Sequence, residues 1–214
     1  MSAGGGGGVP RNRPGGGGVS RDRPDADRHL VLIGMMGVGK SSVGRRLALR
    51  LGRPFVDTDK LVEERAGKSV PEIFADDGEP AFRALESEAV GAALESRSWA
   101  VVAFGGGAVL DPANRDRVRQ AALVVWLQAP PRELARRVSA SQKRSGGTAR
   151  PLLVQGSPEA TSGVQGVPEI LQAIAAGREE CYRAAAHILI DTAGRSPGQV
   201  ATAVLRATGW ELPV

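Results

Sequence analysis

One run of residues has the types and spacing that bind a polyphosphate: Gly34-Met-Met-Gly-Val-Gly-Lys-Ser41. It matches G-x-x-x-x-G-K-[ST], the phosphate-binding loop. Glycines at these positions let backbone N–H groups turn inward around an anion, and the helix that follows adds the positive end of its dipole. Lys40 would reach the β- and γ-phosphates, and the Ser41 hydroxyl would bind Mg²⁺, which prefers oxygen ligands. We expect the ligand to be ATP or another nucleoside triphosphate.

Two carboxylates follow a second short apolar segment. Asp57 and Asp59 flank Thr58 directly after Phe55 and Val56. Open α/β sheets bind ligands at the carboxyl ends of their strands, so these acids are well placed for chemistry. An extended backbone would send both to the same side, where one could hold Mg²⁺ through water and the other could contact a substrate hydroxyl. Asp59 could instead be the N-cap of the next helix, and the residues alone leave both interpretations open.

Apolar runs and helical periodicity alternate from His29 to the end of the chain. Strands are expected at 30–33, 54–57, 99–104, 123–127 and 187–190. Helices are expected at 42–51, 59–66, 70–75, 79–95, from 112, 131–139, 167–186 and 197–207. Alternating strands and helices favour a parallel sheet covered on both faces. We therefore predict an α/β fold with three layers, α/β/α, around a five-stranded parallel sheet.

Composition divides the chain into a tail and one domain. Residues 1–28 are rich in Gly, Pro and Arg and hold almost no large apolar side chain. Such a segment buries too little surface to offset its ordering entropy, so we expect a disordered tail. The domain spans 29–214. Within it, residues 141–166 lack apolar periodicity, and we expect a flexible lid there.

Charge and composition exclude several classes of protein. The net charge of +5 comes from scattered basic residues, and aromatic residues make up only 4% of the chain, so we expect no nucleic-acid partner. The single cysteine, Cys181, excludes an intramolecular disulfide. No stretch reaches the length of a membrane span. We expect a cytoplasmic monomer with no membrane partner.

Six motifs, taken together in this order, resemble those of the shikimate kinases. They are Gly34–Ser41, Asp57-Thr58-Asp59, Phe82-Arg83-Ala-Leu-Glu86, Gly105-Gly106-Gly107, Arg150-Pro151-Leu152-Leu153 and Tyr182-Arg183. The resemblance covers about 29–208. It implies a P-loop kinase fold of the nucleoside monophosphate kinase type. It also implies ATP-dependent phosphorylation of the 3-hydroxyl of shikimate, within aromatic amino-acid biosynthesis, with Mg²⁺ as the metal.

The resemblance also implies roles for individual residues. ATP would be bound by Gly37, Val38, Gly39, Lys40, Ser41, Ser42, Arg144, Arg150 and Arg195. Shikimate would be bound by Asp59, Arg83, Gly106, Gly107 and Arg183. Lys40, Asp59 and Arg150 would be catalytic, and Mg²⁺ would be held by Ser41 and, through water, by Asp57.

Simpler roles exist for two of these arginines. Arg83 has Glu79 and Glu86 at i−4 and i+3, so it could form ordinary surface ion pairs. Arg183 lies among Arg178, Glu179 and Glu180, which would also suit a solvated helix face. The long segments on either side of Arg150 exceed what the family usually carries, and we interpret them as insertions in the lid.

Three other functions compete with the leading hypothesis. A kinase for gluconate or a nucleoside monophosphate would share the phosphate loop. A non-catalytic module could bind ATP or shikimate and regulate a partner, although it would not need the acceptor-activating acid Asp59. The Gly- and Arg-rich tail could bind nucleic acid.

Overall fold

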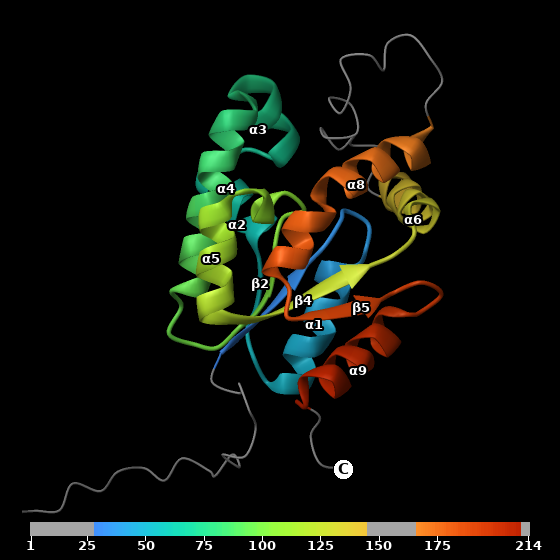
Figure 1. Ribbon diagram of the computed structural model, residues 1–214. Coiled ribbons are helices and arrows are strands. Elements are labelled where there is room, and N and C mark those ends of the chain that lie inside the picture. Colours follow the sequence, from blue (N-terminus) through green and yellow to red (C-terminus); the bar gives the residue numbers. More distant parts are fainter. Residues whose placement is uncertain (1–27, 145–165, 211–214) are drawn as a thin grey trace, which may run out of the picture.

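The computed structural model describes residues 28–144 and 166–210 and has five parallel strands in one sheet (Figure 1). The order across the sheet is β2-β3-β1-β4-β5. The strands are β1 His29–Ile33, β2 Phe55–Asp57, β3 Val101–Ala103, β4 Ala122–Gln128 and β5 Ile188–Asp191. The predicted three-layer α/β fold is confirmed, and the tail assigned to 1–28 lies almost entirely outside the described residues.

The central strand explains why its sequence is apolar without alternation. β1 pairs with β3 on one side and β4 on the other, so that Leu30 lies beside both Val101 and Leu123. Leu30, Val31 and Leu32 have no exposed surface. A parallel strand that is covered on both faces has no polar side, and a continuous apolar run is therefore expected.

Helices cover both faces of the sheet. They are α1 Lys40–Leu51, α2 Thr58–Ala66, α3 Val70–Asp76, α4 Gly78–Leu94, α5 Pro112–Ala121, α6 Pro131–Arg144, α8 Val167–Ala185 and α9 Pro197–Thr208, with a 3₁₀ turn, η1, at Ala108–Leu110. α1 and α9 pack together on one face, while α4, α5 and α8 cover the other (Figure 1). The helices α2, α3 and α4 share a separate apolar cluster, made of Val62, Ile73, Phe74, Phe82 and Ala89.

Several boundaries differ from the sequence-based prediction by one or two residues, and two differences bear on the pocket. α6 continues to Arg144, beyond the predicted end at Ser139 and into the segment predicted as a lid. Its last residues are mostly polar, so they carry no apolar periodicity, yet Ala, Gln, Lys and Arg have good helix propensity. The second difference is that α2 already begins at Thr58, so the extended backbone ends at Asp57. In the described part of the chain, no helix is both long and apolar enough to cross a membrane.

Candidate active site

The phosphate loop joins β1 to α1 and turns on glycines with positive φ. Gly34, Gly37 and Gly39 have φ angles of 137°, 79° and 104°. A Cβ at Gly34 would also collide with the carbonyl oxygen of Leu127 on β4. Gly39 is the N-cap of α1, so the loop leads directly into the positive end of the helix dipole. The backbone therefore has the glycine turn and the helix start that the sequence predicts for a phosphate-binding loop.

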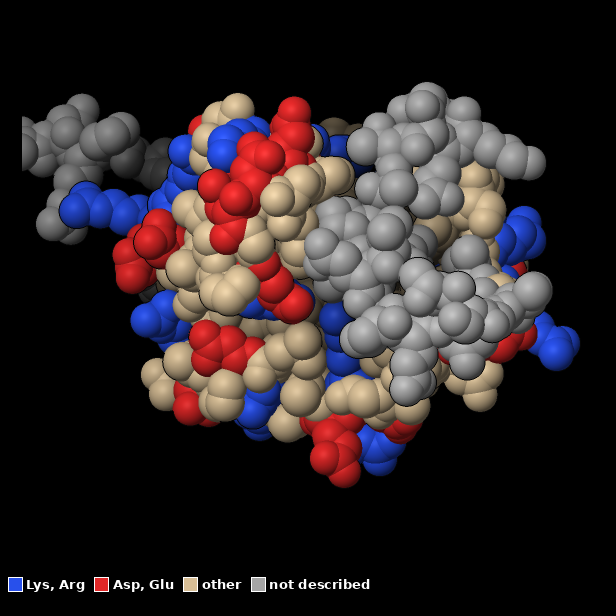
Figure 2. Space-filling view, turned by 90° about the horizontal axis from the view of Figure 1, so that it is seen from above, with Lys and Arg blue, Asp and Glu red and all other residues tan. Residues whose placement is uncertain are grey.

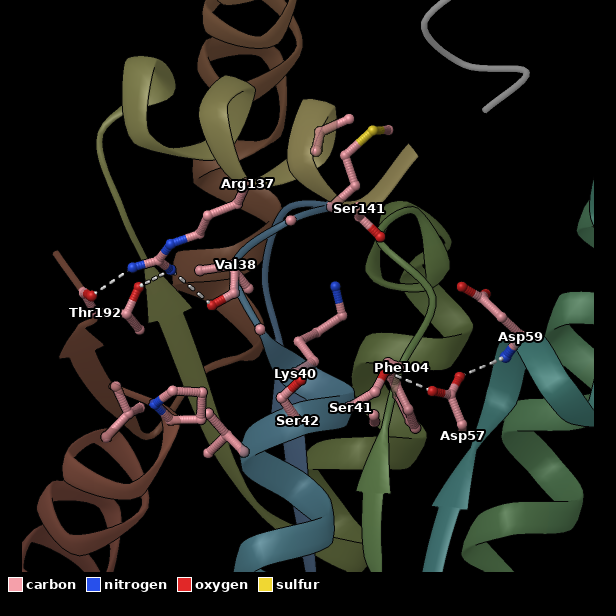
Figure 3. Close-up of a pocket in the computed structure, with 18 of the residues that line it drawn as sticks. Val38, Lys40, Ser41, Ser42, Asp57, Asp59, Phe104, Arg137, Ser141 and Thr192 are labelled. Atoms are coloured by element: carbon pink, nitrogen blue, oxygen red, sulfur yellow. Dashed lines mark hydrogen bonds between the residues drawn. The ribbon is translucent and has the colours of Figure 1, made fainter. Parts of the chain in front are cut away.

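Lys40 lies across this loop. Its Nζ donates to the carbonyl oxygens of Gly34 at 2.8 Å and of Met35 at 3.1 Å. The side chain points into a pocket (Figure 3). The two carbonyls therefore hold the ammonium group over the concave side of the loop, where the phosphates of a nucleotide would lie.

The pocket has a volume of about 440 Å³ and runs along the carboxyl ends of the strands. Its walls come from the phosphate loop, the ends of β2 and β3, α6, and the segment between β5 and α9. The lining residues are Met36, Gly37, Val38, Gly39, Lys40, Ser41, Ser42, Val43, Asp57, Asp59, Ala103, Phe104, Arg137, Val138, Ser141, Thr192, Arg195, Pro197 and Val200. Viewed from above, basic and acidic side chains lie next to each other near the centre of this face (Figure 2).

Ser41 and Asp57 form a pair of oxygen donors at one side of the pocket. The Ser41 hydroxyl donates to Oδ2 of Asp57 at 2.6 Å, and Oδ1 of Asp57 accepts from the backbone N–H of Asp59 at 3.2 Å (Figure 3). Asp57 is therefore the N-cap of α2, and the interpretation of Asp59 as that cap is wrong. Among the described residues, no group of three or more His, Cys, Asp or Glu side chains could hold a metal.

Asp59 lies in the first turn of α2 and lines the same pocket. The helix already begins at Thr58, so the two acids do not share a side through an extended backbone. They meet in the pocket because the cap turns the chain there. The Thr58 hydroxyl, which is buried, accepts from the backbone N–H of Gly105 at 2.8 Å and ties α2 to the end of β3.

The three glycines after β3 are needed because side chains from other helices lie against them. A Cβ at Gly105 would lie 2.5 Å from Oε1 of Glu86 and 2.6 Å from Oδ1 of Asp59. A Cβ at Gly107 would lie 2.8 Å from Cζ of Arg83. The backbone angles do not require glycine here, since none of the three has a positive φ. Glycine is needed because there is no space for a side chain. The space is taken by Asp59, Glu86 and Arg83, which therefore surround one turn.

Arg83 and Glu86 form a partly buried ion pair on α4. Nη1 of Arg83 donates to Oε2 of Glu86 at 2.6 Å, and Nη2 donates to Oε1 of Glu79 at 2.9 Å. Glu86 is almost fully buried, with 3% of its side chain exposed. Burial raises the pKa of Glu86, an effect opposed by Arg83 and increased by Asp59. Arg83 thus pairs with both expected glutamates, but the pair with Glu86 is buried rather than on the surface. Its guanidinium also lies against Gly107.

The structure does not bring Arg183 to this cluster. Its side chain is 71% exposed and pairs with Glu179 at 2.5 Å on the outer face of α8. The arginine that reaches the turn is Arg178, which is 9% exposed and donates from Nη1 to the carbonyl oxygen of Gly106 at 3.2 Å. Arg178 lies four residues before the buried Tyr182, on the same helix face. This four-residue spacing is the feature of the sequence that could have identified Arg178.

The opposite end of the pocket holds a second arginine that the sequence analysis missed. Arg137, on α6, donates to the carbonyl oxygens of Val38 at 3.2 Å and of Thr192 at 2.8 Å (Figure 3). It connects the phosphate loop to the segment that carries Arg195 and Pro197, which also line the pocket. The side chain of Arg144 and the whole of Arg150 lie outside the described residues.

Comparison with known proteins agrees with this geometry. The family model for shikimate kinase matches residues 36–208. A shikimate kinase of Symbiobacterium thermophilum is 44% identical over 177 residues, which are 83% of this chain and 94% of that protein. One from Geobacter sulfurreducens is also 44% identical over 177 residues, covering 88% of its length.

A solved structure is similar over most of its length. The shikimate kinase from Acinetobacter baumannii, determined in complex with shikimate, superposes with a TM-score of 0.73 at 30% identity. The match covers 87% of this chain and 96% of the other. The motifs, the geometry of the pocket and these matches all lead to the same assignment. The chain belongs to the shikimate kinase family.

Proposed function

We propose that this chain transfers the terminal phosphoryl group of ATP to the 3-hydroxyl of shikimate, giving 3-phosphoshikimate and ADP. One observation carries the proposal: the phosphate loop and Asp59 line a single pocket, and Asp59 lies against the triglycine turn that also contacts Arg83 and Arg178. A nucleotide donor and a small anionic acceptor would thus meet in one site. The membership in the shikimate kinase family supports the same reaction.

The nucleotide would occupy the part of the pocket between the phosphate loop and α9. Backbone amides of Gly37, Val38 and Gly39, with Lys40, Ser41 and Ser42, would surround the phosphates. Arg137, Arg195 and Pro197 line the far end, where the base would lie. Arg144 keeps its proposed place near the base, and Arg137 is an additional arginine at this end of the pocket.

Mg²⁺ fits the donor set beside the phosphates. The Ser41 hydroxyl and the Asp57 carboxylate are adjacent oxygen donors, and Mg²⁺ is usually held by one or two such groups, with water and phosphate oxygens completing the octahedron. Ser41 would bind the ion directly and Asp57 through water. When bound, the ion would neutralise charge on the β- and γ-phosphates.

Shikimate would lie against the triglycine turn. It is a small ring with one carboxylate and three hydroxyls. We assign the carboxylate to Arg83 and Arg178, because a guanidinium fork donates two parallel hydrogen bonds to a carboxylate. Arg178 replaces Arg183 in this role. The amides of Gly106 and Gly107 have no acceptor among the described residues and would donate to the substrate.

Asp59 would orient the acceptor hydroxyl and take its proton as the new P–O bond forms. Phosphoryl transfer needs alignment and positive charge more than covalent chemistry from the protein. Lys40 would supply charge at the transferring group. Arg150 keeps its proposed place over the same phosphate, within a lid that would exclude water from ATP.

A panel of acceptors with Mg²⁺ and ATP tests the proposal, with ADP release as the readout. We expect rapid release with shikimate and little with gluconate or a nucleoside monophosphate. Equal or faster turnover of another acceptor would replace the proposed substrate. Tight binding of shikimate without ADP release would favour the non-catalytic module. The cytoplasmic location and the monomeric state stay predictions.

A further inference from the structure

Tyr182 of α8 contacts the triglycine turn from the interior of the protein. Its side chain is 1% exposed, and its ring stacks on Trp126 of β4 with the ring centres 5.6 Å apart. The hydroxyl donates to the carbonyl oxygen of Gly106 at 2.5 Å. The ring therefore has a fixed position in the core, and the hydroxyl group is held against the backbone that would face the substrate.

Gly106 receives two donors on one carbonyl. The Tyr182 hydroxyl and Nη1 of Arg178 both donate to its oxygen, which has two lone pairs and is thus fully used. The carbonyl oxygens of the two neighbouring glycines also accept hydrogen bonds. The N–H of Ala108 donates to the carbonyl oxygen of Gly105 at 3.2 Å, and that of Leu110 donates to the carbonyl oxygen of Gly107 at 2.8 Å.

The fixed carbonyl determines where an amide points. The C=O of Gly106 and the N–H of Gly107 belong to one planar trans peptide and point in opposite directions. Holding the carbonyl toward α8 therefore turns the Gly107 amide away from α8. The position of this carbonyl also fixes the guanidinium of Arg178, because Arg178 and Tyr182 donate to the same oxygen.

We propose that Tyr182 is a positioning residue for the acceptor site: its hydroxyl sets the orientation of the Gly106–Gly107 peptide and the place of the Arg178 guanidinium, and so determines shikimate affinity. The inference rests on the proposed function. Tyr182 does not touch the substrate, and its role is carried by Gly106. Burial raises the pKa of Tyr182 to about 12, so the phenol stays a donor throughout the working range of pH.

The phosphate loop touches the same hydroxyl. Sδ of Met35 lies 3.7 Å from the Tyr182 oxygen. The phenol has one hydrogen, and the short contact to Gly106 uses it, so the thioether contact is van der Waals packing. Tyr182 thus contacts both the phosphate loop and the triglycine turn, but only the triglycine turn accepts its hydrogen bond. This difference makes the inference testable.

The test is Tyr182→Phe, which removes the hydroxyl and keeps the ring on Trp126. We expect the KM for shikimate to rise by about tenfold, the usual effect of one lost hydrogen bond, while kcat and the KM for ATP change less than about twofold. That pattern is the loss of an interaction made equally in the ground and transition states. The ratio of the KM for shikimate of the variant to that of the wild type should stay constant between pH 6.5 and 9.

Ser87→Ala is the matched control. The Ser87 hydroxyl donates to Oδ1 of Asn114 at 3.0 Å, a partly buried bond between α4 and α5. Its loss should lower the melting temperature without raising the KM for shikimate. If Tyr182→Phe behaves like this control, or if its KM ratio varies with pH, the inference is overturned. Failure of the proposed function would be distinct, because the wild-type chain itself would then not turn over shikimate.

A second measurement, by ¹⁹F NMR, keeps the Tyr182 hydroxyl and needs no substitution. Tyr182 is the only tyrosine in the chain, so growth on 3-fluorotyrosine places one fluorine reporter on this ring. We expect its ¹⁹F resonance to shift when shikimate alone is added. A resonance that moves with ADP but not with shikimate would contradict the inference.

Discussion

The proposed chemistry depends most on Asp59. It is a first-turn helix residue whose carboxylate lines the pocket, while the capping work of α2 is done by Asp57. Asp59→Asn should lower kcat by about 10²- to 10⁴-fold, the usual contribution of a general base. Affinity for an ATP analogue, measured by calorimetry, should stay within about twofold, since the shape of the side chain is unchanged.

The matched control for this substitution is Asp111→Asn. Asp111 is the exposed N-cap of α5 and accepts from the backbone N–H of Ala113 at 2.8 Å. Asn is as good an N-cap as Asp, so turnover should be unaffected. Normal turnover in Asp59→Asn would remove the proposed role of that acid.

Two arginines of α8, Arg178 and Arg183, should differ in their effect on shikimate binding. Arg178 is buried against Gly106, whereas Arg183 is exposed and paired with Glu179. Arg178→Lys keeps the charge but loses the planar fork, and we expect the KM for shikimate to rise by about 10- to 100-fold. Arg183→Ala should leave steady-state kinetics unchanged, since exposed ion pairs contribute little. The reverse result would restore Arg183 to the site.

At the scale of elements, the triglycine turn connects α2, α4 and α8. Gly107→Ala is compatible with the backbone, whose φ is −106°, but its Cβ would displace the Arg83 guanidinium. We expect kcat/KM for shikimate to fall by roughly 10- to 100-fold, as small misplacements in active sites do. Steady-state kinetics at saturating ATP measures this loss.

Gly177→Ala is the paired control for that turn. Gly177 lies within α8, and a Cβ there would meet nothing within 4 Å. Alanine in a helix interior is favoured over glycine by roughly 0.5–1 kcal/mol, so the melting temperature should rise and the activity should stay the same. Equal kinetic damage from both substitutions would show that the turn has no special role.

The elements also show what the sequence could and could not predict. The five strands and the phosphate loop were predicted because each depends on neighbouring residues: a continuous apolar run, then glycines, then a helix. Arg178 was missed because α8 carries arginines on more than one face. Choosing between Arg178 and Arg183 requires knowing which face packs on the sheet. The burial of Tyr182 decides this, and Arg178 then follows at i−4.

The end of α6 was missed for a different physical reason. Its last turn is polar, so no apolar stripe marks it. Arg137 was overlooked for a related reason, since its role depends on contacts with Val38 and Thr192, which are far apart in the sequence. Long-range contacts of this kind are decided by the fold, and local patterns do not contain them.

For the whole molecule, His29 links stability to pH. It is buried at the start of β1, and its Nδ1 accepts from the backbone N–H of Ala100 at 3.1 Å. Burial lowers its pKa from the ordinary value of 6.5. The backbone of Leu94 partly opposes this effect, and nearby Arg53 lowers the pKa further. Below this ordinary value the unfolded chain takes up a proton that the folded chain does not, so stability falls as the pH falls through that region.

His29→Asn removes the titration and keeps an acceptor for Ala100. The free energy of unfolding of the wild-type chain should fall between pH 7.5 and 5.5, by up to about 1.4 kcal/mol per pH unit below the ordinary value. The variant should lack this component, even if it is less stable overall. Urea unfolding at several pH values measures the difference, and parallel curves would show that His29 does not titrate on unfolding.

In the proposed reaction, the phosphate loop and the cluster around the triglycine turn act on one pair of substrates. Its most direct test is a single turnover with ATP labelled in the γ-phosphate. We expect the label to appear in the 3-phosphate ester of shikimate, and we expect little inorganic phosphate to form when shikimate is absent. Label released as inorganic phosphate at the same rate with or without shikimate would contradict it.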